Sequence, residues 1–269
     1  MTAGRALSLV VHADSKAGKT TLGATAPKPM LLIDAEAAHR FLPHKKVYWD
    51  PISERPPILG QGRISQSDPT IYEIDWEICV VIVREYTVME RTYEWLNSGQ
   101  HPFRSVVVDS ISEIQKKCKD SMRALGEDMD QRKWGALLDR MEWLVRGLRD
   151  LTEHPTTPLE IVYITAMTSQ RDGKWRPYVQ GQLAVSMPYF LDIIGYLFVQ
   201  EIPHADPTQP ATKMRRLLVS DHPQIQAGER VQGRLPEVVD NPTLPAILDA
   251  VFGPEPTTTA TPITEGTIA

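Results

Sequence analysis

The segment His12–Leu22, HADSKAGKTTL, decides how the rest of the chain is interpreted. It ends in Gly18-Lys19-Thr20, as a phosphate-binding loop does, but it has Ala13 at the position where such a loop usually begins with Gly. Backbone N–H groups of such a loop point at phosphate oxygens, and the N-terminus of the following helix adds positive potential. Ala fits the first position if the backbone there does not need a positive φ. The segment predicts a nucleotide site formed by Ala13, Asp14, Ser15, Lys16, Ala17, Gly18, Lys19, Thr20 and Thr21.

The residues around this loop have the pattern that a phosphate site requires. The apolar run Ala6–His12 predicts a buried strand, Thr20–Ala26 can begin a helix, and Met30–Ile33 predicts a second strand. This order of strand, loop, helix and strand is typical of the opening of a parallel α/β sheet.

The remaining pattern predicts an α/β fold of the P-loop NTPase kind, with a mostly parallel central sheet flanked by helices and with late antiparallel strands. A long helix from Gln131 is indicated by apolar residues at helical spacing, which we assign to the core. We expect one domain over residues 1–253, an irregular Pro-rich insertion at about 43–77, and a disordered Thr/Pro-rich tail over 254–269. Further strands are expected at 79–84, 105–108, 159–165, 193–200 and 214–220, and further helices at 87–97 and 244–252.

Composition excludes several classes of protein. The net charge of −5 gives no global attraction to nucleic acid, so a DNA contact would need a local basic patch. Cys79 and Cys118 are far apart, which argues against a disulfide framework and a zinc site. No apolar run is long enough for a membrane span or a signal-peptide core, so we expect a cytoplasmic protein.

Two residues of the predicted site suit Mg²⁺-dependent ATP chemistry. Lys19 would reach the β- and γ-phosphates of ATP, and the Thr20 hydroxyl would lie on Mg²⁺. Asp109 follows Val106-Val107-Val108, a buried strand that delivers one carboxylate at its end, as a Walker B strand does. We expect Asp109 to hold Mg²⁺ partly through water.

The segment LLIDAEAA places carboxylates at the same edge of the sheet, where ligands bind in open α/β folds. A hydrolytic NTPase needs a group that orients and polarises the attacking water, and Glu36 is the candidate. The alternative is that Asp34 caps a helix and that Glu36 is a solvated side chain.

Taken in order, HADSKAGKTTL, LLIDAEAA and RSVVVDSIS resemble the RecA-like ATPase core. Residues of about 5 to 252 are similar to the phage single-strand-annealing proteins built on a minimal RecA core, the RecA-like branch of the Sak proteins. KVYWDP, SGQHPFRSVVVDSISE, DIIGYLFV and GRLPEVVDNPTL carry this narrower resemblance.

The resemblance implies ATP-linked binding of single-stranded DNA and annealing or strand exchange in phage recombination, within the cytoplasm of an infected bacterium. It also implies self-association into rings or filaments and cooperation with a single-strand-binding protein. It makes Glu36 the catalytic carboxylate, Thr165 a γ-phosphate contact and Arg230 a cation near a neighbouring subunit's nucleotide. The chain departs from the family at Ala166, where a Gln relay is usual, and at Gly228, where a Lys is usual.

The segment SQRDGKWRPYVQGQL is the candidate DNA contact. Asp172-Gly173 predicts a two-residue hairpin turn, and the residues around it mix cations with aromatic rings. Cations hold phosphates and rings stack on bases in single-strand binding. The candidate residues are Arg171, Lys174, Trp175, Arg176 and Tyr178, and the alternative is a solvated hairpin with a packed Trp175.

Two other functions fit the phosphate loop. One is a DNA-binding module that uses ATP only as an assembly ligand, which the departures at Ala13, Ala166 and Gly228 favour. The other is a small-molecule kinase, although the insertion offers only Arg55 and Arg63 for an Arg-rich lid.

Overall fold

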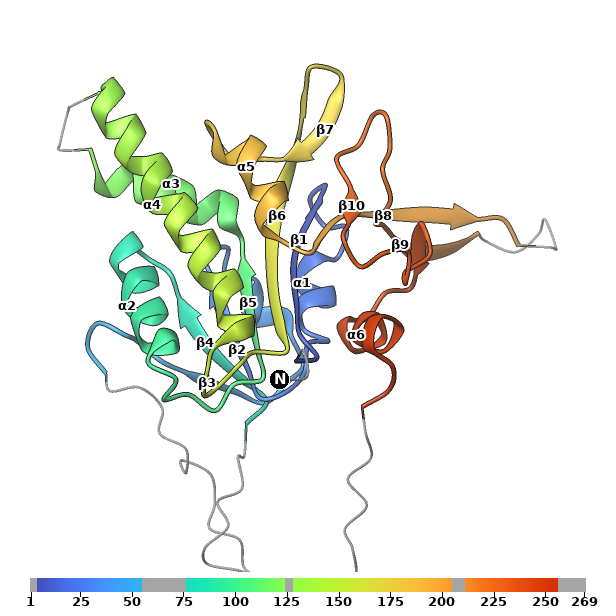
Figure 1. The fold of residues 1–269 in the computed structure, drawn as a ribbon, viewed down its shortest axis with the longest axis horizontal. Helices are drawn as coiled ribbons and strands as arrows, with labels where there is room; N and C mark the ends of the chain where they lie inside the picture. The colour runs from blue at the N-terminus through green and yellow to red at the C-terminus, as the bar shows by residue number, and fades with distance from the viewer. Residues whose placement is uncertain (1–3, 55–75, 124–127, 205–210, 256–269) are drawn as a thin grey trace, which may run out of the picture.

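The strands of the computed structural model form one sheet, and the structure describes residues 4–54, 76–123, 128–204 and 211–255 (Figure 1). Within these ranges the 11 strands have the order β11-β9-β8-β1-β6-β5-β2-β4-β3, with β10 paired to β8 and β7 paired to β6. The strands are β1 (Leu7–Ala13), β2 (Met30–Asp34), β3 (Lys46–Tyr48), β4 (Ile78–Ile82), β5 (Ser105–Asp109), β6 (Ile161–Arg171), β7 (Lys174–Pro177), β8 (Ile193–Ile202), β9 (Thr212–Leu218), β10 (Gly228–Glu229) and β11 (Val238–Asp240).

The centre of the sheet is parallel, and its strands are buried on both faces. β1 pairs in parallel with β6 and β8, β5 lies between β6 and β2, and β2 pairs with β4. Such strands are expected to be continuously apolar, as MLLID in β2 and SVVVD in β5 nearly are. Because all these strands run in the same direction, the residues at their carboxyl ends meet at one edge.

Helices cover both faces of this sheet (Figure 1). One apolar cluster joins the sheet to α2 (Tyr86–Asn97), α3 (Ile111–Ser121), α4 (Gln131–Asp150) and α5 (Leu183–Phe190). The other cluster joins it to α1 (Lys19–Gly23) and α6 (Leu244–Phe252). Two short 3-10 helices, η1 (Ala38–Phe41) and η2 (Leu151–Glu153), complete the described elements.

The late strands form an antiparallel extension beside β1, as expected. β9 runs antiparallel to β8, and β11 runs antiparallel to β9. The far ends of β8 and β9 project from the body of the molecule as a two-stranded ribbon on the right of Figure 1. This arrangement brings residues of β9 over the opening of α1, which sequence spacing alone could not indicate.

Most elements agree with the sequence pattern, and the insertion at 43–77 needs a correction. The apolar stripe of α4 is core, with Leu137, Met141 and Leu144 fully buried. The predicted irregular segment contains β3, which pairs in parallel with β4 and forms the edge of the sheet. Residues 55–75 of the insertion, and all but the first two residues of the predicted tail, lie outside the described residues.

Candidate active site

The phosphate loop connects the end of β1 to the start of α1. Gly18 has φ 106° and Lys16 has φ 65°, so the loop contains two left-handed positions. Gly adopts such a conformation without strain, which explains Gly18. Ala13 is still part of β1 and has no positive φ, so the usual glycine is not required there. The substitution at the first position is therefore compatible with a normal loop.

Lys19 is held inside this loop by backbone carbonyl groups. Its Nζ donates to the carbonyl oxygens of Ala13 and Asp14, each at 3.1 Å. Burial lowers the pKa of Lys19, and the nearby carboxylates of Glu36, Asp109 and Asp14 partly oppose this effect. A desolvated ammonium group that bonds only neutral carbonyls gains from the arrival of an anion. Lys19 is thus prepared for a phosphate ligand.

Asp109 ends β5 and is fixed by two threonine hydroxyls. Thr20 Oγ1 donates to Asp109 Oδ2 at 2.6 Å, and Thr165 Oγ1 donates to Asp109 Oδ1 at 2.5 Å. Burial raises the pKa of Asp109, and the two hydroxyl bonds oppose the rise. Thr20 and Asp109 are hard oxygen donors of the class that Mg²⁺ prefers, so the residues fit this ion.

Thr165 lies in β6 between the strand of the phosphate loop and the strand of Asp109. Its side chain is fully buried, and it is not one of the residues that line the cavity. In this geometry Thr165 orients the Asp109 carboxylate, whereas the family resemblance makes it a direct phosphate contact.

In the segment LLIDAEAA, Asp34 has the capping role of the alternative interpretation, and the catalytic role of Glu36 stays a prediction. Asp34 is fully buried and accepts bonds from the backbone N–H groups of Glu36 and His39, at 2.8 and 2.9 Å, and from His39 Nδ1 at 2.5 Å. It therefore caps the turn that leads into η1, as the structural alternative predicts. Glu36 nevertheless lines the cavity, and the hydroxyl of Ser110 donates to its Oε1.

Ser110 is a positioning residue that sequence reasoning missed. It is the N-cap of α3 and accepts a bond from the Glu113 N–H at 3.3 Å. The capping pattern Ser-x-x-Glu was available in the sequence as a signal for this helix start. The same hydroxyl that caps α3 also holds Glu36 beside Asp109.

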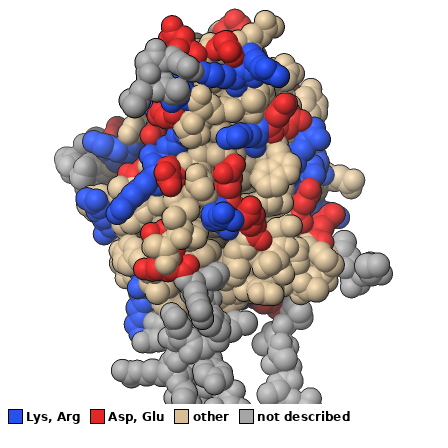
Figure 2. Space-filling view, turned by 90° about the vertical axis from the view of Figure 1, so that its left-hand side faces the viewer, with Lys and Arg blue, Asp and Glu red and all other residues tan. Residues whose placement is uncertain are grey.

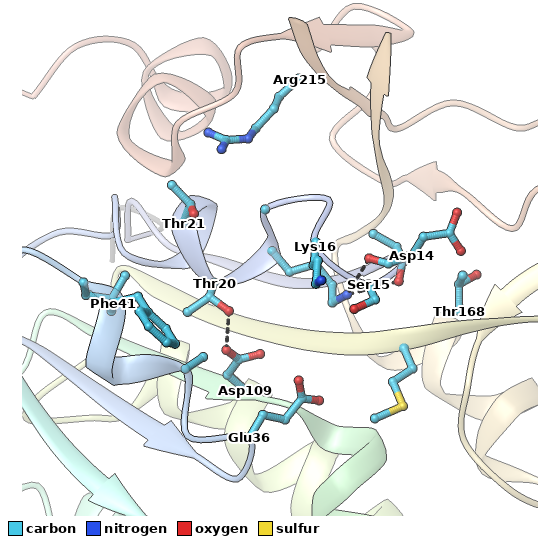
Figure 3. Close-up of a pocket in the computed structure, with 16 residues that line it drawn as sticks. Asp14, Ser15, Lys16, Thr20, Thr21, Glu36, Phe41, Asp109, Thr168 and Arg215 are labelled. Carbon is cyan, nitrogen blue, oxygen red and sulfur yellow. Dashed lines mark hydrogen bonds between the residues drawn. The ribbon is translucent and has the colours of Figure 1, made fainter. Parts of the chain in front are cut away.

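These residues surround a cavity of about 520 Å³ (Figure 3). This volume is in the range of small-molecule sites. All the predicted loop residues line it except Ala17, which is buried behind the loop. Six lining residues from other segments were not predicted for this site, namely Ala38, Phe41, Leu42, Met167, Thr168 and Arg215.

Phe41 forms an apolar wall of the cavity. Its side chain is 88% exposed, and it projects from η1 toward the space beside Thr20 (Figure 3). A large exposed ring at the edge of a polar cavity suits stacking against a flat heterocycle. The sequence offered no signal for it, because a Phe in a loop is usually a packing residue.

His12, immediately before the loop, connects the site to the segment behind it. Its buried ring contacts Thr168 Oγ1 through Nδ1 at 3.0 Å and the Gln226 carbonyl through Nε2 at 2.8 Å. Because Nε2 faces a carbonyl oxygen, it carries the proton, and Nδ1 accepts from the threonine. The structure thus assigns His12 a structural role, as its position at a strand end suggests.

Acidification should destabilise the fold between pH 6.5 and about 4. Burial lowers the pKa of His12 to about 4, and burial does the same to the pKa of His101. The folded state therefore binds fewer protons than the unfolded state, so stability is full above pH 6.5 and is lost as the pH falls. Each histidine contributes on the order of 3 kcal/mol to this loss. The free energy of unfolding, determined by urea denaturation at pH 7 and at pH 4.5, measures this loss of stability.

His101→Phe provides the control for this prediction. The ring of His101 stacks on Phe103, and neither ring nitrogen has a hydrogen-bond partner within the described part of the chain. A Phe at this position should keep the packing and remove one proton-binding group. An equal loss of stability on acidification in wild type and variant would contradict the assignment.

The hairpin predicted around Asp172-Gly173 is formed by β6 and β7. Both turn residues have positive φ, 52° and 74°, and Arg171 pairs with Lys174 while Ser169 pairs with Arg176. Side chains alternate along a strand, so Arg171, Lys174 and Arg176 share one face. Trp175 is on the other face and is partly buried, with its backbone bonded to Gln224 and Gln226. Tyr178 follows the hairpin at its base.

Arg230 is placed far from the phosphate loop of its own chain. Its backbone N–H bonds to the Asp192 carbonyl, beside the start of β8, and its side chain donates to the Tyr189 carbonyl at 2.6 Å. The phosphate loop lies at the opposite end of the neighbouring strand β1. Arg230 therefore cannot reach the nucleotide of its own chain, and a role toward a neighbouring subunit stays a prediction.

Both cysteines lie within the described ranges, Cys79 in β4 and Cys118 in α3. No group of three or more His, Cys, Asp or Glu residues there could hold a metal ion, and both Cys side chains are buried and unpaired. None of the helices in these ranges combines the length and the apolar character that crossing a bilayer requires.

Comparison with known proteins adds a family to this geometry. No curated protein matches the sequence. A family model described as an AAA domain matches residues 5–231, a range that includes the phosphate loop, Glu36, Asp109 and the β6–β7 hairpin. The match covers most of the chain, and the loop, the partly buried lysine and the paired Thr20 and Asp109 are the parts that such a domain uses for a nucleotide. The chain therefore belongs to the AAA domain family of P-loop ATPases.

Proposed function

We propose that this protein hydrolyses ATP with Mg²⁺, binds single-stranded DNA, and promotes annealing or strand exchange as a multimer in phage recombination. The observation that carries the proposal is that the basic hairpin begins at the wall of the ATP cavity. Thr168 lines the cavity and pairs with Pro177 at the root of the hairpin. A DNA contact on the hairpin would thus act directly on the nucleotide site.

The arrangement of carboxylates supports hydrolysis. Glu36 lies beside Asp109 and opposite Thr20 in the cavity (Figure 3). With Thr20 and Asp109 as the Mg²⁺ donors, Glu36 is the carboxylate beside them that would orient and polarise a water molecule. Mg²⁺ would supply charge neutralisation of the phosphates. Lys19 would supply the positive charge within the loop.

The charge distribution favours the hairpin as the DNA contact. Three cations lie together on one face of the hairpin, which costs stability through like-charge repulsion unless a polyanion is bound. In contrast, Lys and Arg are interspersed with Asp and Glu on the face that carries α2 and α4 (Figure 2). Trp175 lies on the other face and is partly buried, so its ring is less available to stack on a base. We therefore expect contacts between the cations and the phosphates to contribute most of the DNA affinity.

The test is ATP turnover with and without a single-stranded oligonucleotide, together with DNA affinity as a function of salt. Replacing Arg171, Lys174 and Arg176 by Ser should abolish stimulation and reduce the salt slope of binding by about 2, since each contact to a single strand contributes about 0.7. The charge-matched control replaces Lys116, Lys117 and Lys119 of α3 by Ser and should behave as wild type.

Other outcomes of this test would favour the alternatives. DNA binding with negligible turnover would make ATP an assembly ligand. An absence of DNA binding in the presence of ATP would contradict the recombination function and favour a kinase. Sedimentation with and without ATP measures the proposed self-association, and addition of a single-strand-binding protein tests that further partner.

A further inference from the structure

One cation beside the ATP cavity comes from a part of the chain that is distant in sequence. Arg215 of β9 lines the cavity and reaches toward the phosphate loop from above in Figure 3. It lies over Gly18, where an added Cβ would be only 2.7 Å from the Arg215 Nε. The guanidinium group therefore covers a point of the loop that has no side chain.

The neighbouring cations on this ribbon are neutralised, whereas Arg215 is not. Arg216 Nε donates to Asp240 at 2.6 Å and its Nη1 donates to Gln200 at 2.6 Å, and Lys213 pairs with Glu201 at 3.7 Å. Within the part of the chain that the structure describes, the Arg215 guanidinium has no hydrogen bond or ion pair. Arg215 and Arg216 differ because adjacent residues of a strand point to opposite faces.

The balance of charges in the cavity indicates what the unpaired Arg215 could bind. The lining holds the cations Lys16, Lys19 and Arg215 and the carboxylates Asp14, Glu36 and Asp109, so the charges of the protein cancel. A bound triphosphate adds further negative charge, so each cation within reach would stabilise the complex. The planar guanidinium group matches two phosphate oxygens at once.

We infer that Arg215 binds the polyphosphate chain of the nucleotide, within the same chain that carries the phosphate loop. This inference rests on the proposed ATP site and deepens it. It is independent of the DNA contact, because β9 and the β6–β7 hairpin are separate elements.

The experiment is calorimetric titration of the full-length protein with MgATP and MgADP. Arg215→Ala should weaken MgATP binding by about 10- to 100-fold, the range of a hydrogen bond to a charged group. Arg215→Lys should recover part of the loss, because it restores the charge without the fork. Arg216→Ala, on the opposite face of β9, is the matched control and should bind MgATP as the wild type does. Affinity of Arg215→Ala within twofold of wild type would overturn the inference.

Thermal unfolding separates ligand binding from a structural role. Without nucleotide, Arg215→Ala should unfold at the wild-type Tm, because the side chain is exposed and has no partner of its own. The rise in Tm on adding MgATP should be smaller than in wild type. An equal fall in Tm with and without nucleotide would overturn the inference. If MgATP binding depends on Arg215 while no DNA is bound, the inference stands and the recombination function fails.

Discussion

Glu36→Gln should lower the ATP turnover number by about 10²- to 10⁴-fold, the usual contribution of a general base. The amide keeps the size of the side chain and can still contact the Ser110 hydroxyl, but it cannot take a proton from water. MgATP affinity should change little, because Lys19, Thr20 and Asp109 are untouched. Phosphate release in steady state, with MgATP affinity determined separately, checks both parts.

The matched control is Glu113→Gln at the start of α3. Glu113 is also a carboxylate near Ser110, but its side chain pairs with Lys116 at 2.9 Å and is not part of the cavity lining. The Glu113→Gln variant should keep the ATP turnover number of the wild type. Equal activity of Glu36→Gln and wild type would remove Glu36 from the chemistry, and a parallel loss of MgATP binding would make it a binding group.

Lys19→Met should abolish measurable binding of MgATP at micromolar concentrations while leaving the fold intact. The ammonium group is the positive charge at the centre of the loop, and its loss removes a charge-assisted contact to each phosphate it would reach. In the absence of nucleotide the variant should be at least as stable as wild type, because burial of the charge is a cost. Calorimetric titration and thermal unfolding measure the two effects.

Lys213→Met is the control for the loss of one positive charge. Lys213 lies on β9 and its side chain is largely exposed. It should bind MgATP like wild type. A Lys19→Met protein that binds MgATP normally would contradict the assignment of the loop, and one that is strongly destabilised without nucleotide would contradict the cost assigned to the buried charge.

The local parts of the site could be predicted because each is a short segment of sequence. Three strands can be identified as apolar runs followed by polar residues. They are the strand before Gly18-Lys19-Thr20, the strand that ends at Asp34 and the strand that ends at Asp109. Parallel strands bring their carboxyl ends to one edge, so the meeting of these residues followed from the fold class.

The remaining contacts depend on the order of strands, which no local pattern contains. Thr165 contacts Asp109 because β6 lies between β1 and β5. Arg215 reaches Gly18 because the antiparallel β9 returns along β8, next to β1. In the sequence, Lys213, Arg215 and Arg216 on a strand are typical of a solvated sheet edge, so the local pattern gives no sign of this contact.

β6 also has a mechanical consequence. It is one continuous strand from Ile161 to Arg171, and its first six residues are buried while the last two are exposed. The tip of the hairpin is about 16 Å beyond Ala166, at about 3.3 Å for each residue. A tilt of β6 would therefore move Arg171 and Lys174 together with the segment of Gln224 and Gln226, which is bonded to the backbone of Trp175. The strand that holds Asp109 in place is thus the same continuous element that carries the hairpin cations.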